Sequence, residues 1–292
     1  MVNFIMEQEN LSFPEAVRFL AKRAGMEVPE DEGDRDASRY RQRLLDLNRD
    51  AARFYYQTLQ QPEGAGVRTY LEKRKISRST AVKFGMGASP DSWDALLLAM
   101  TKKGYSKREL LDAGLVVQNK NGRLYDKFRN RLMLPVIDTR GDVVAFGSRV
   151  LDKSEPKYMN SSETPVYSKR RVLYGLNLAK KTKRPNIILC EGNLDIVTLH
   201  QAGFDNAVAS MGTALTPEQV RLLSRFTKEL VLCYDNDTAG KLPVTSAIVC
   251  SVRVIVGICL RSPRGNDIKH VCHPPIFCRV CFALCLWLYY IL

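Results

Sequence analysis

The sequence predicts an α/β fold, or α+β when the whole chain is considered: a mostly helical, mixed first part followed by a parallel sheet with flanking helices. The main signal lies in residues 187–237, where three short apolar runs alternate with two segments of helical pattern. Strand, helix, strand, helix, strand in that order favours parallel strands with helices packed on them. Two of the runs end on carboxylates, Glu191 in the first and Asp235 with Asp237 in the last. Ligands of such sheets bind at the carboxyl ends of the strands, so these three acids are expected to meet at one edge and to suit divalent metal ions.

Composition and charge support a second expectation, a polyanionic partner. The 292 residues are enough for about two domains. There are 44 Lys and Arg against 31 Asp and Glu, a net charge of +13, and residues 120–184 alone hold 16 basic and 6 acidic side chains. A basic segment that leads directly into an acidic metal cleft indicates nucleic acid rather than membrane. The alternative is an ordinary basic, solvated surface.

Before this basic segment the pattern is mainly helical. Apolar spacing predicts a helix over 11–25 and another over 39–60, separated by an acidic linker at 28–38. Shorter helices are predicted at 66–75, 92–103 and 106–113, with Ser92 and Ser106 as the N-caps of the last two.

The pattern changes after Gly122. Residues 131–138 and 142–150, separated by a Thr-Arg-Gly turn, predict a β-hairpin. The segment 156–176 has no clear period and interleaves aromatic with basic residues, which suits stacking on bases and contact with phosphates. A solvated loop with ordinary charges is the alternative. Further on, Thr216 and Gln219 flank Pro217 in the pattern that opens a helix.

The tail after Lys241 has a different character. Six of the eight cysteines lie between 250 and 285, and the apolar run at the end, 280–292, has 13 residues, short of the ~20 that a membrane-spanning helix needs. These cysteines match no paired C-x2-C zinc pattern, although zinc binding is an alternative. We expect 242–292 to be atypical, for instance the product of a frameshift. No secretory signal is evident, and a reducing, cytoplasmic location is expected.

Four stretches of the sequence resemble one family. The segment YDKFRNRLMLPVIDTRGDVVAFGSRVLDKSEPKYMNSSETPVYSKRRVLYGL is similar to the basic polymerase segment of bacterial DnaG-type DNA primases. ILCEGNLDIVTLHQAGFDNAVASMGTALT and LCYDNDTAGK resemble the Toprim module of the same family, and NLSFPEAVRFLAKRAGMEVPE resembles the stretch that follows its zinc ribbon. The resemblance implies this division of the chain: 1–27 after a missing zinc ribbon, 28–38 linker, 39–184 basic N-terminal subdomain of the core, 185–241 incomplete Toprim module, 242–292 atypical tail.

The resemblance also assigns residues. Glu191, Asp235 and Asp237 match the catalytic, metal-binding acids, and Asp195 matches the acid four residues after the glutamate. The positions that match the template- and nucleotide-binding segment are Arg129, Arg131, Arg149, Lys157, Tyr158, Asn160 and Lys169. Each has a simpler alternative, because an Asp-x-Asp can cap a turn and an arginine can serve a surface ion pair. The chain departs from the family at Asn236 and Arg170, where glycine is usual, and a later acidic motif is missing.

The resemblance implies that the chain is a nucleotidyltransferase that acts in DNA replication. It would join ribonucleoside triphosphates into an RNA primer on a single-stranded DNA template, with Mg2+ (or Mn2+) held by the acids. No zinc is expected in this chain, and the family's replicative helicase would bind a region that this chain lacks. Glu191 would be a metal ligand or the group that moves the proton. The alternatives are another Toprim enzyme, topoisomerase-like or nuclease-like, or an inactive fragment that binds single-stranded DNA.

Overall fold

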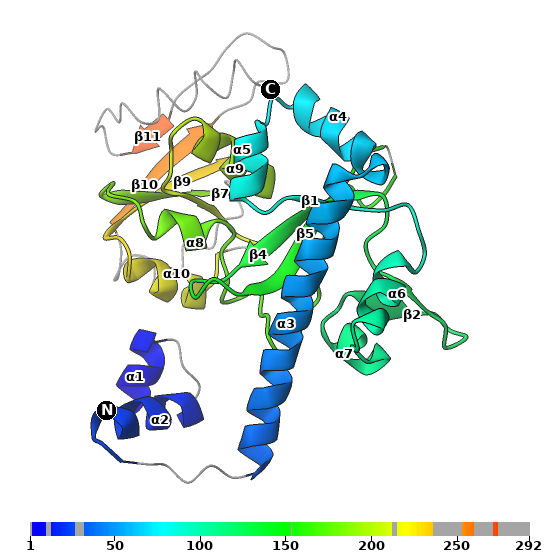
Figure 1. Cartoon of the computed structure of the whole chain (residues 1–292). Coiled ribbons are helices and arrows are strands. Elements are labelled where there is room, and N and C mark those ends of the chain that lie inside the picture. The colour runs from blue at the N-terminus through cyan, green and yellow to red at the C-terminus, as the bar shows by residue number, and fades with distance from the viewer. Residues whose placement is uncertain are drawn as a thin grey trace.

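A computed structural model of the chain describes residues 2–9, 13–26, 32–152, 154–211, 215–235, 253–259 and 271–273. Two sheets stand side by side with helices packed around them (Figure 1), so the predicted combination of a mixed first part and a parallel sheet with flanking helices is confirmed. The division into segments at 27, 38, 184 and 241 stays a prediction.

Helix α3, Glu32–Gln60, is the longest described element and runs along one side of the first sheet (Figure 1). Two shorter helices precede it, α1 (Val2–Glu9) and α2 (Phe13–Arg23). Helix α3 begins inside the segment predicted as a linker. Its first turns carry Asp34 and Asp36, and acidic side chains are stabilised near the positive end of a helix, so the acidic composition that suggested a linker also favours a helix start.

Five short helical elements follow α3 along the chain. They are η1 (Pro62–Gly64), α4 (Ala65–Lys73), α5 (Arg78–Lys83), α6 (Ala95–Lys102) and α7 (Lys107–Asp112). Ser106 caps α7 in a capping box with Glu109, as predicted. The N-cap of α6 is Asp94 rather than Ser92. The first N–H groups of α6 are instead bound by a distant residue, because the carboxylate of Asp126 accepts from Leu96 at 2.7 Å and from Leu97 at 3.0 Å.

The first sheet is antiparallel, with the order β1 (Gly87–Ser89), β4 (Arg131–Ile137), β5 (Val143–Val150) and β6 (Tyr158–Asn160). The hairpin predicted from 131–150 is the pair β4–β5. Strands β2 (Val116–Gln118) and β3 (Leu124–Asp126) form a separate small sheet. Helix α3 approaches β1 so closely that a Cβ at Gly87 would lie 2.6 Å from the backbone of Tyr55.

The second sheet has the order β11-β10-β9-β7-β8, and all its described strands are parallel except β11. In chain order the elements are α8 (Leu176–Ala179), β7 (Asn186–Cys190), α9 (Asn193–Gln201), β8 (Ala207–Ala209), α10 (Pro217–Ser224), β9 (Glu229–Asp235), β10 (Arg253–Cys259) and β11 (Val271–His273). The predicted alternation and the Thr216–Gln219 capping box are confirmed. Strand β10, within the predicted tail, pairs along β9.

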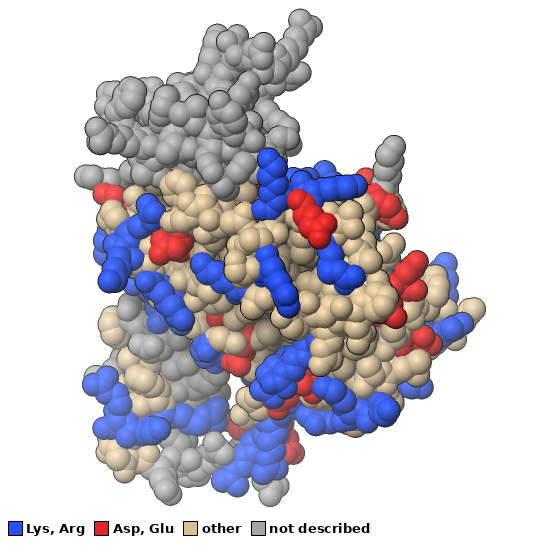
Figure 2. Space-filling model, turned by 45° about the horizontal axis from the view of Figure 1, so that its top comes forward, with Lys and Arg blue, Asp and Glu red and all other residues tan. Residues whose placement is uncertain are grey.

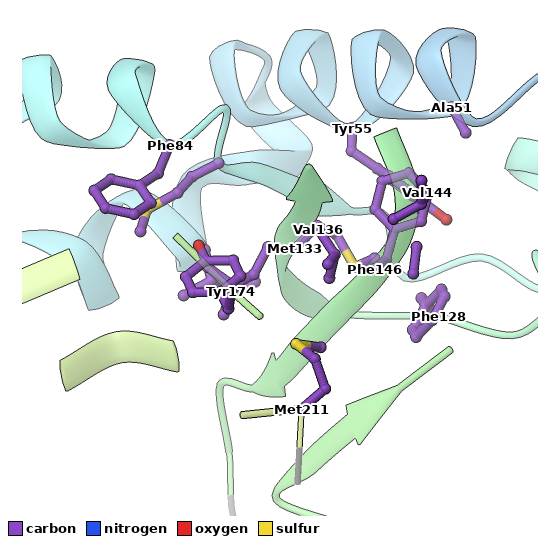
Figure 3. Close-up of a cluster of buried hydrophobic side chains, with 14 of the residues drawn as sticks. Ala51, Tyr55, Phe84, Phe128, Met133, Val136, Val144, Phe146, Tyr174 and Met211 are labelled. Carbon is purple, nitrogen blue, oxygen red and sulfur yellow. The ribbon is translucent and has the colours of Figure 1, made fainter. Parts of the chain in front are cut away.

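One continuous core fixes the two sheets to each other. Tyr55 on α3 contacts Phe146 on β5 edge to face, with ring centroids 5.4 Å apart, and Phe84 stacks on Tyr174 at 5.9 Å (Figure 3). The same cluster continues into α9 and the adjoining face of the second sheet. A second cluster packs α8 and α10 on the opposite face of that sheet. The first sheet is thereby held between α3 and the start of α9, which positions the site described next.

Candidate active site and nucleic-acid interface

The predicted carboxylates lie at the ends of neighbouring strands. Strands β7 and β9 are adjacent and parallel, and Cys190 is the partner of Cys233. Glu191, the next residue along the chain, is therefore level with Tyr234, one residue before Asp235. Neighbouring strands are about 4.8 Å apart, so the backbones of Glu191 and Asp235 meet at one sheet edge. The structure describes the backbone of Asp235, whereas Asp237 lies outside the described residues.

Asp195 lies in the first turn of α9, which begins directly after this edge. Its carboxylate folds back toward the N-cap residue, because a Cβ added to Gly192 would lie 2.5 Å from Oδ2 of Asp195. An acid in this place stabilises the positive end of the helix. Asp195 therefore shapes the turn that follows Glu191.

The start of α9 faces the first sheet across Gly147. A Cβ at Gly147 on β5 would lie 2.9 Å from Nδ2 of Asn193 and 3.1 Å from Oδ1 of Asn160 on β6. The Nδ2 of Asn160 also donates to the carbonyl oxygen of Met211, at 3.4 Å, just beyond β8. Because Gly147 has no side chain, Asn160 of β6 and Asn193 of α9 can both lie close to β5. Asn193 is two residues after Glu191 in the chain.

The face of β5 and β6 that carries Gly147 and Asn160 also carries a basic and aromatic group. Arg149 and Tyr158 are Cα partners, and Nη1 of Arg149 donates to Oη of Tyr158 at 2.5 Å. The guanidinium lies 5.1 Å from the ring centroid of Tyr158 and 5.0 Å from that of Tyr70. Side chains two residues apart on a strand share a face, so this group lies beside Gly147 and Asn160. We call these six residues, Tyr70, Gly147, Arg149, Tyr158, Asn160 and Asn193, the β5–β6 strip.

The other predicted arginines differ in exposure and partners. Arg131 is buried, its Nη1 donates to the carbonyl oxygen of Pro156 at 3.0 Å, and burial lowers the pKa of its guanidinium. It therefore holds the segment before β6 in place. Arg129 lies over Trp93, 4.2 Å from the ring centroid, and 5.2 Å from that of Tyr125. Trp93 is 59% exposed. An arginine stacked on an exposed tryptophan presents a cationic and aromatic surface, which suits a nucleic acid.

The predicted lysines lie along the same basic segment. Lys157 is exposed, directly before Tyr158. Lys169 is half-buried near Lys127, whose pKa is lowered by burial and further by the charge of Lys169. The Nζ of Lys127 donates to Oγ of Ser162 at 3.1 Å. Two cations that repel each other are stabilised when an anion such as a phosphate lies between them.

Sequence reasoning missed Tyr70, Trp93, Lys127 and Asn193. The sequence contained a usable signal for Trp93, a large aromatic residue in a Ser-, Pro- and Asp-rich turn, and for Lys127, which lies within the quoted basic segment. Tyr70 and Asn193 join the strip through tertiary contact, which local pattern does not reveal. Figure 2 shows how widely Lys and Arg side chains spread over one face of the molecule, with fewer acidic side chains between them.

A separate cavity of about 690 Å³ lies between α3, the β4–β5 turn and residues 163–173. None of the predicted site residues lines it. The cavity is therefore separate from both the carboxylate edge and the β5–β6 strip.

Comparison with known proteins identifies the family of the chain. Residues 54–180 match the family described as DNA primase catalytic core, N-terminal domain, and residues 188–269 match the Toprim-like family. A solved DnaG primase catalytic domain bound to single-stranded DNA is 38% identical, covers 79% of this chain and 76% of its own, and superposes with a TM-score of 0.68. The chain belongs to the DnaG-type DNA primase family. The first match contains all seven predicted basic-segment residues, and the second contains the four predicted acids.

Other members of the primase family give the same picture. The DNA primase of Clostridium acetobutylicum is 43% identical over 82% of this chain and 40% of its own length, and that of Escherichia coli K12 is 41% identical over 82% and 42%. The RNA polymerase domain of Mycobacterium tuberculosis primase DnaG, in complex with double-stranded DNA, is 37% identical, covers 77% of this chain and 74% of its own, and has a TM-score of 0.68. This chain thus spans about two fifths of the length of the curated primases it matches.

The Toprim-like match implies a divalent metal ion, and the donor set fits one. Glu191 and Asp235 end neighbouring parallel strands, and carboxylate oxygens are the ligands that hard divalent ions prefer. Within the described ranges no group of three or more His, Cys, Asp or Glu side chains could hold a metal, and Asp237 lies outside those ranges.

No helix in the described part of the chain is long and apolar enough to cross a membrane.

Proposed function

We propose that this primase-family chain joins ribonucleoside triphosphates into RNA on a single-stranded DNA template. The observation that carries the proposal is the shared edge of β7 and β9, where the backbones of Glu191 and Asp235 meet, two residues along the chain from Asn193 of the β5–β6 strip. A carboxylate edge next to a basic and aromatic surface matches what nucleotidyl transfer needs. Relatives bound to single-stranded and double-stranded DNA support a nucleic-acid template.

Each group has a role in this proposal. Arg149 and Tyr158 hold the template, since the guanidinium neutralises a phosphate and the ring, 45% exposed, offers a face on which a base stacks. Lys127, Lys157 and Lys169 neutralise the phosphates of the incoming nucleotide. Asn160 and Asn193, with amide groups that both donate and accept, orient the nucleotide near the edge.

Glu191, Asp235 and Asp237 would hold the divalent ion, for which we propose Mg2+ because all three donors are hard oxygens. When bound, the ion stabilises the charge that develops as a 3′-hydroxyl attacks the α-phosphate and pyrophosphate leaves. We also assign to Glu191, which is exposed at the strand end, the role of accepting the proton of that hydroxyl.

A template-dependent incorporation assay tests the proposal. The full chain is incubated with labelled ribonucleoside triphosphates and single-stranded DNA, with Mg2+ or Mn2+ in separate reactions. We expect labelled product only when template is present. Asp235→Ala and Glu191→Gln should each lower incorporation by about a hundredfold or more, because metal-ion charge stabilisation is worth several kcal/mol. Both variants should still bind single-stranded DNA.

Other results would overturn this assignment. A chain that binds DNA but makes no product with either ion would be an inactive DNA-binding fragment. A chain that cuts or relaxes DNA without incorporating nucleotides would be a different Toprim enzyme. Equal incorporation by Asp235→Ala and the parent chain would remove the carboxylates from the mechanism.

A further inference from the structure

Cys190 and Cys233 lie directly opposite each other on β7 and β9. They are Cα partners in the parallel ladder, and both are thiols. Neighbouring strands are about 4.8 Å apart, whereas the Cα atoms of disulfide-linked cysteines are usually about 4.4–6.8 Å apart. The backbone spacing at this pair therefore already lies in the range that a disulfide requires.

Both thiols project to the same face of the sheet. Side chains alternate along a strand, and the two buried clusters record the alternation. One cluster takes Ile187, Leu189, Leu230 and Leu232. The other takes Ile188, Cys190 and Val231, with Cys233 packed against it. The two thiols therefore lie on neighbouring strands and on the same face of the sheet.

Cys190 and Cys233 differ in solvent exposure. Cys190 is 3% exposed and Cys233 is partly exposed. A small oxidant can reach Cys233 from solvent, whereas burial protects Cys190 from external reagents. With one accessible and one protected cysteine, an intramolecular Cys190–Cys233 disulfide is favoured over a mixed disulfide between Cys233 and the oxidant.

The pair lies directly beneath the carboxylate edge. Cys190 immediately precedes Glu191, and Cys233 is two residues before Asp235. A disulfide holds the Cβ atoms of its two cysteines about 3.8 Å apart, so the bond constrains the ends of β7 and β9 that carry Glu191 and Asp235. A displacement of about 1 Å in a catalytic site can lower the rate about a hundredfold.

We propose that Cys190 and Cys233 form a reversible redox site that controls the carboxylate edge. The oxidant is a low-molecular-weight disulfide of the glutathione class. The thiolate of Cys233 attacks one of its sulfurs and releases one thiol. The thiolate of Cys190 then attacks the sulfur of Cys233 and releases the second thiol, so two protein thiols become one disulfide and the oxidant gains two electrons and two protons. Excess thiol attacks the disulfide and reverses both exchanges, so the step is reversible.

Peptide mapping of the full chain tests the bond itself. Trypsin cleaves after Arg221, Arg225 and Lys228, so the two cysteines fall on different peptides. After incubation with oxidised glutathione we expect a Cys190–Cys233 linked pair that dithiothreitol separates. Cys233→Ala and Cys190→Ala should each abolish it. Modification of the other cysteines with no Cys190–Cys233 link would overturn the proposal.

The expected loss of nucleotide incorporation on oxidation rests on the proposed function, so it is measured in a separate assay. Incorporation by the oxidised chain should fall about tenfold or more and recover with dithiothreitol, and Cys233→Ala should be insensitive to oxidant. A mapped link with unchanged incorporation would overturn the control of the edge. If the reduced chain makes no product, the proposed function fails, and the mapping still decides whether the redox site exists.

Discussion

Arg149 on β5 donates through Nη1 to the phenolic oxygen of Tyr158 on β6, its Cα partner across the ladder. The guanidinium also lies 5.0 Å from the ring centroid of Tyr70. Its buried Nε has no hydrogen-bond partner among the residues that the structure describes. Two aromatic rings thus fix a charge in position on the face that leads to Gly147 and Asn193. A cation held in this way is ready for an anionic partner and loses little side-chain entropy on binding.

Arg149→Ala should weaken binding of single-stranded DNA about tenfold, because one phosphate contact and the stacking geometry of Tyr158 are lost together. The slope of log K against log salt should become shallower by about 0.7, the value for one contact to a single strand. Fluorescence anisotropy with a labelled oligonucleotide at several salt concentrations measures both quantities. Arg140→Ala is the matched control, since Arg140 on the β4–β5 turn pairs with Asp138 at 3.2 Å. Equal weakening by the two variants would point to net charge alone.

Gly147→Ala should lower nucleotide incorporation about tenfold or more while the chain stays folded. The added methyl would lie 2.9 Å from Nδ2 of Asn193, so the start of α9, and Glu191 with it, must shift. Incorporation rate and thermal unfolding midpoint are measured on the same preparation. Gly33→Ala is the control, because a Cβ there meets nothing within 4 Å. A variant with normal rate and lowered melting temperature would make Gly147 a packing residue only.

The two sheets differ in how far the sequence predicted them. Strands β7, β8 and β9 of the second sheet followed from the hydrophobic pattern, because apolar runs ending on Glu191 and Asp235 are a local signal and parallel topology brings their ends to one edge. Strands β10 and β11 were not predicted, since they lie in the segment 242–292 that was expected to be atypical. The cap of α6 was predicted at Ser92, and Asp126 takes that role from 30 residues away along the chain. No local pattern contains such a contact. In the β5–β6 strip, Arg149, Tyr158 and Asn160 were predicted from the family resemblance, whereas Tyr70 and Asn193, which join it through tertiary contact, were not.

Asp126 should make the chain less stable as pH rises from about 4 to 7. Burial raises the pKa of its carboxyl to about 6, although the N–H groups of Leu96 and Leu97 oppose this. Between the unfolded pKa and the folded one, the folded chain binds more protons than the unfolded chain, so ionisation costs stability in that window. Relative to Asp126→Asn, the parent chain should lose roughly 2–3 kcal/mol of unfolding free energy. Urea unfolding of both chains across the pH range measures the difference, and parallel curves would contradict the assignment.

His200 should act in the opposite direction, with its stabilisation lost as pH falls below about 6.5. Burial lowers the pKa of its imidazole. Since the carbonyl oxygen of Ala207 only accepts, Nε2 carries the proton and donates at 2.9 Å, while Nδ1 has no hydrogen-bond partner in the described part of the chain. Protonating Nδ1 would bury an unpaired charge. The unfolded chain therefore binds the proton more readily, and stability declines through the window below the unfolded pKa.

His200→Gln isolates this contribution, because the glutamine amide can donate to Ala207 without titrating. At pH 7.5 the variant should be less stable by about 1 kcal/mol, since it loses the edge contact of the imidazole with Phe84 at 5.2 Å. The gap should close as pH falls, by at most about 1.4 kcal/mol per pH unit. Urea unfolding from pH 7.5 to 5 follows it. A gap that stays constant over this range would mean that His200 titrates as it does in the unfolded chain.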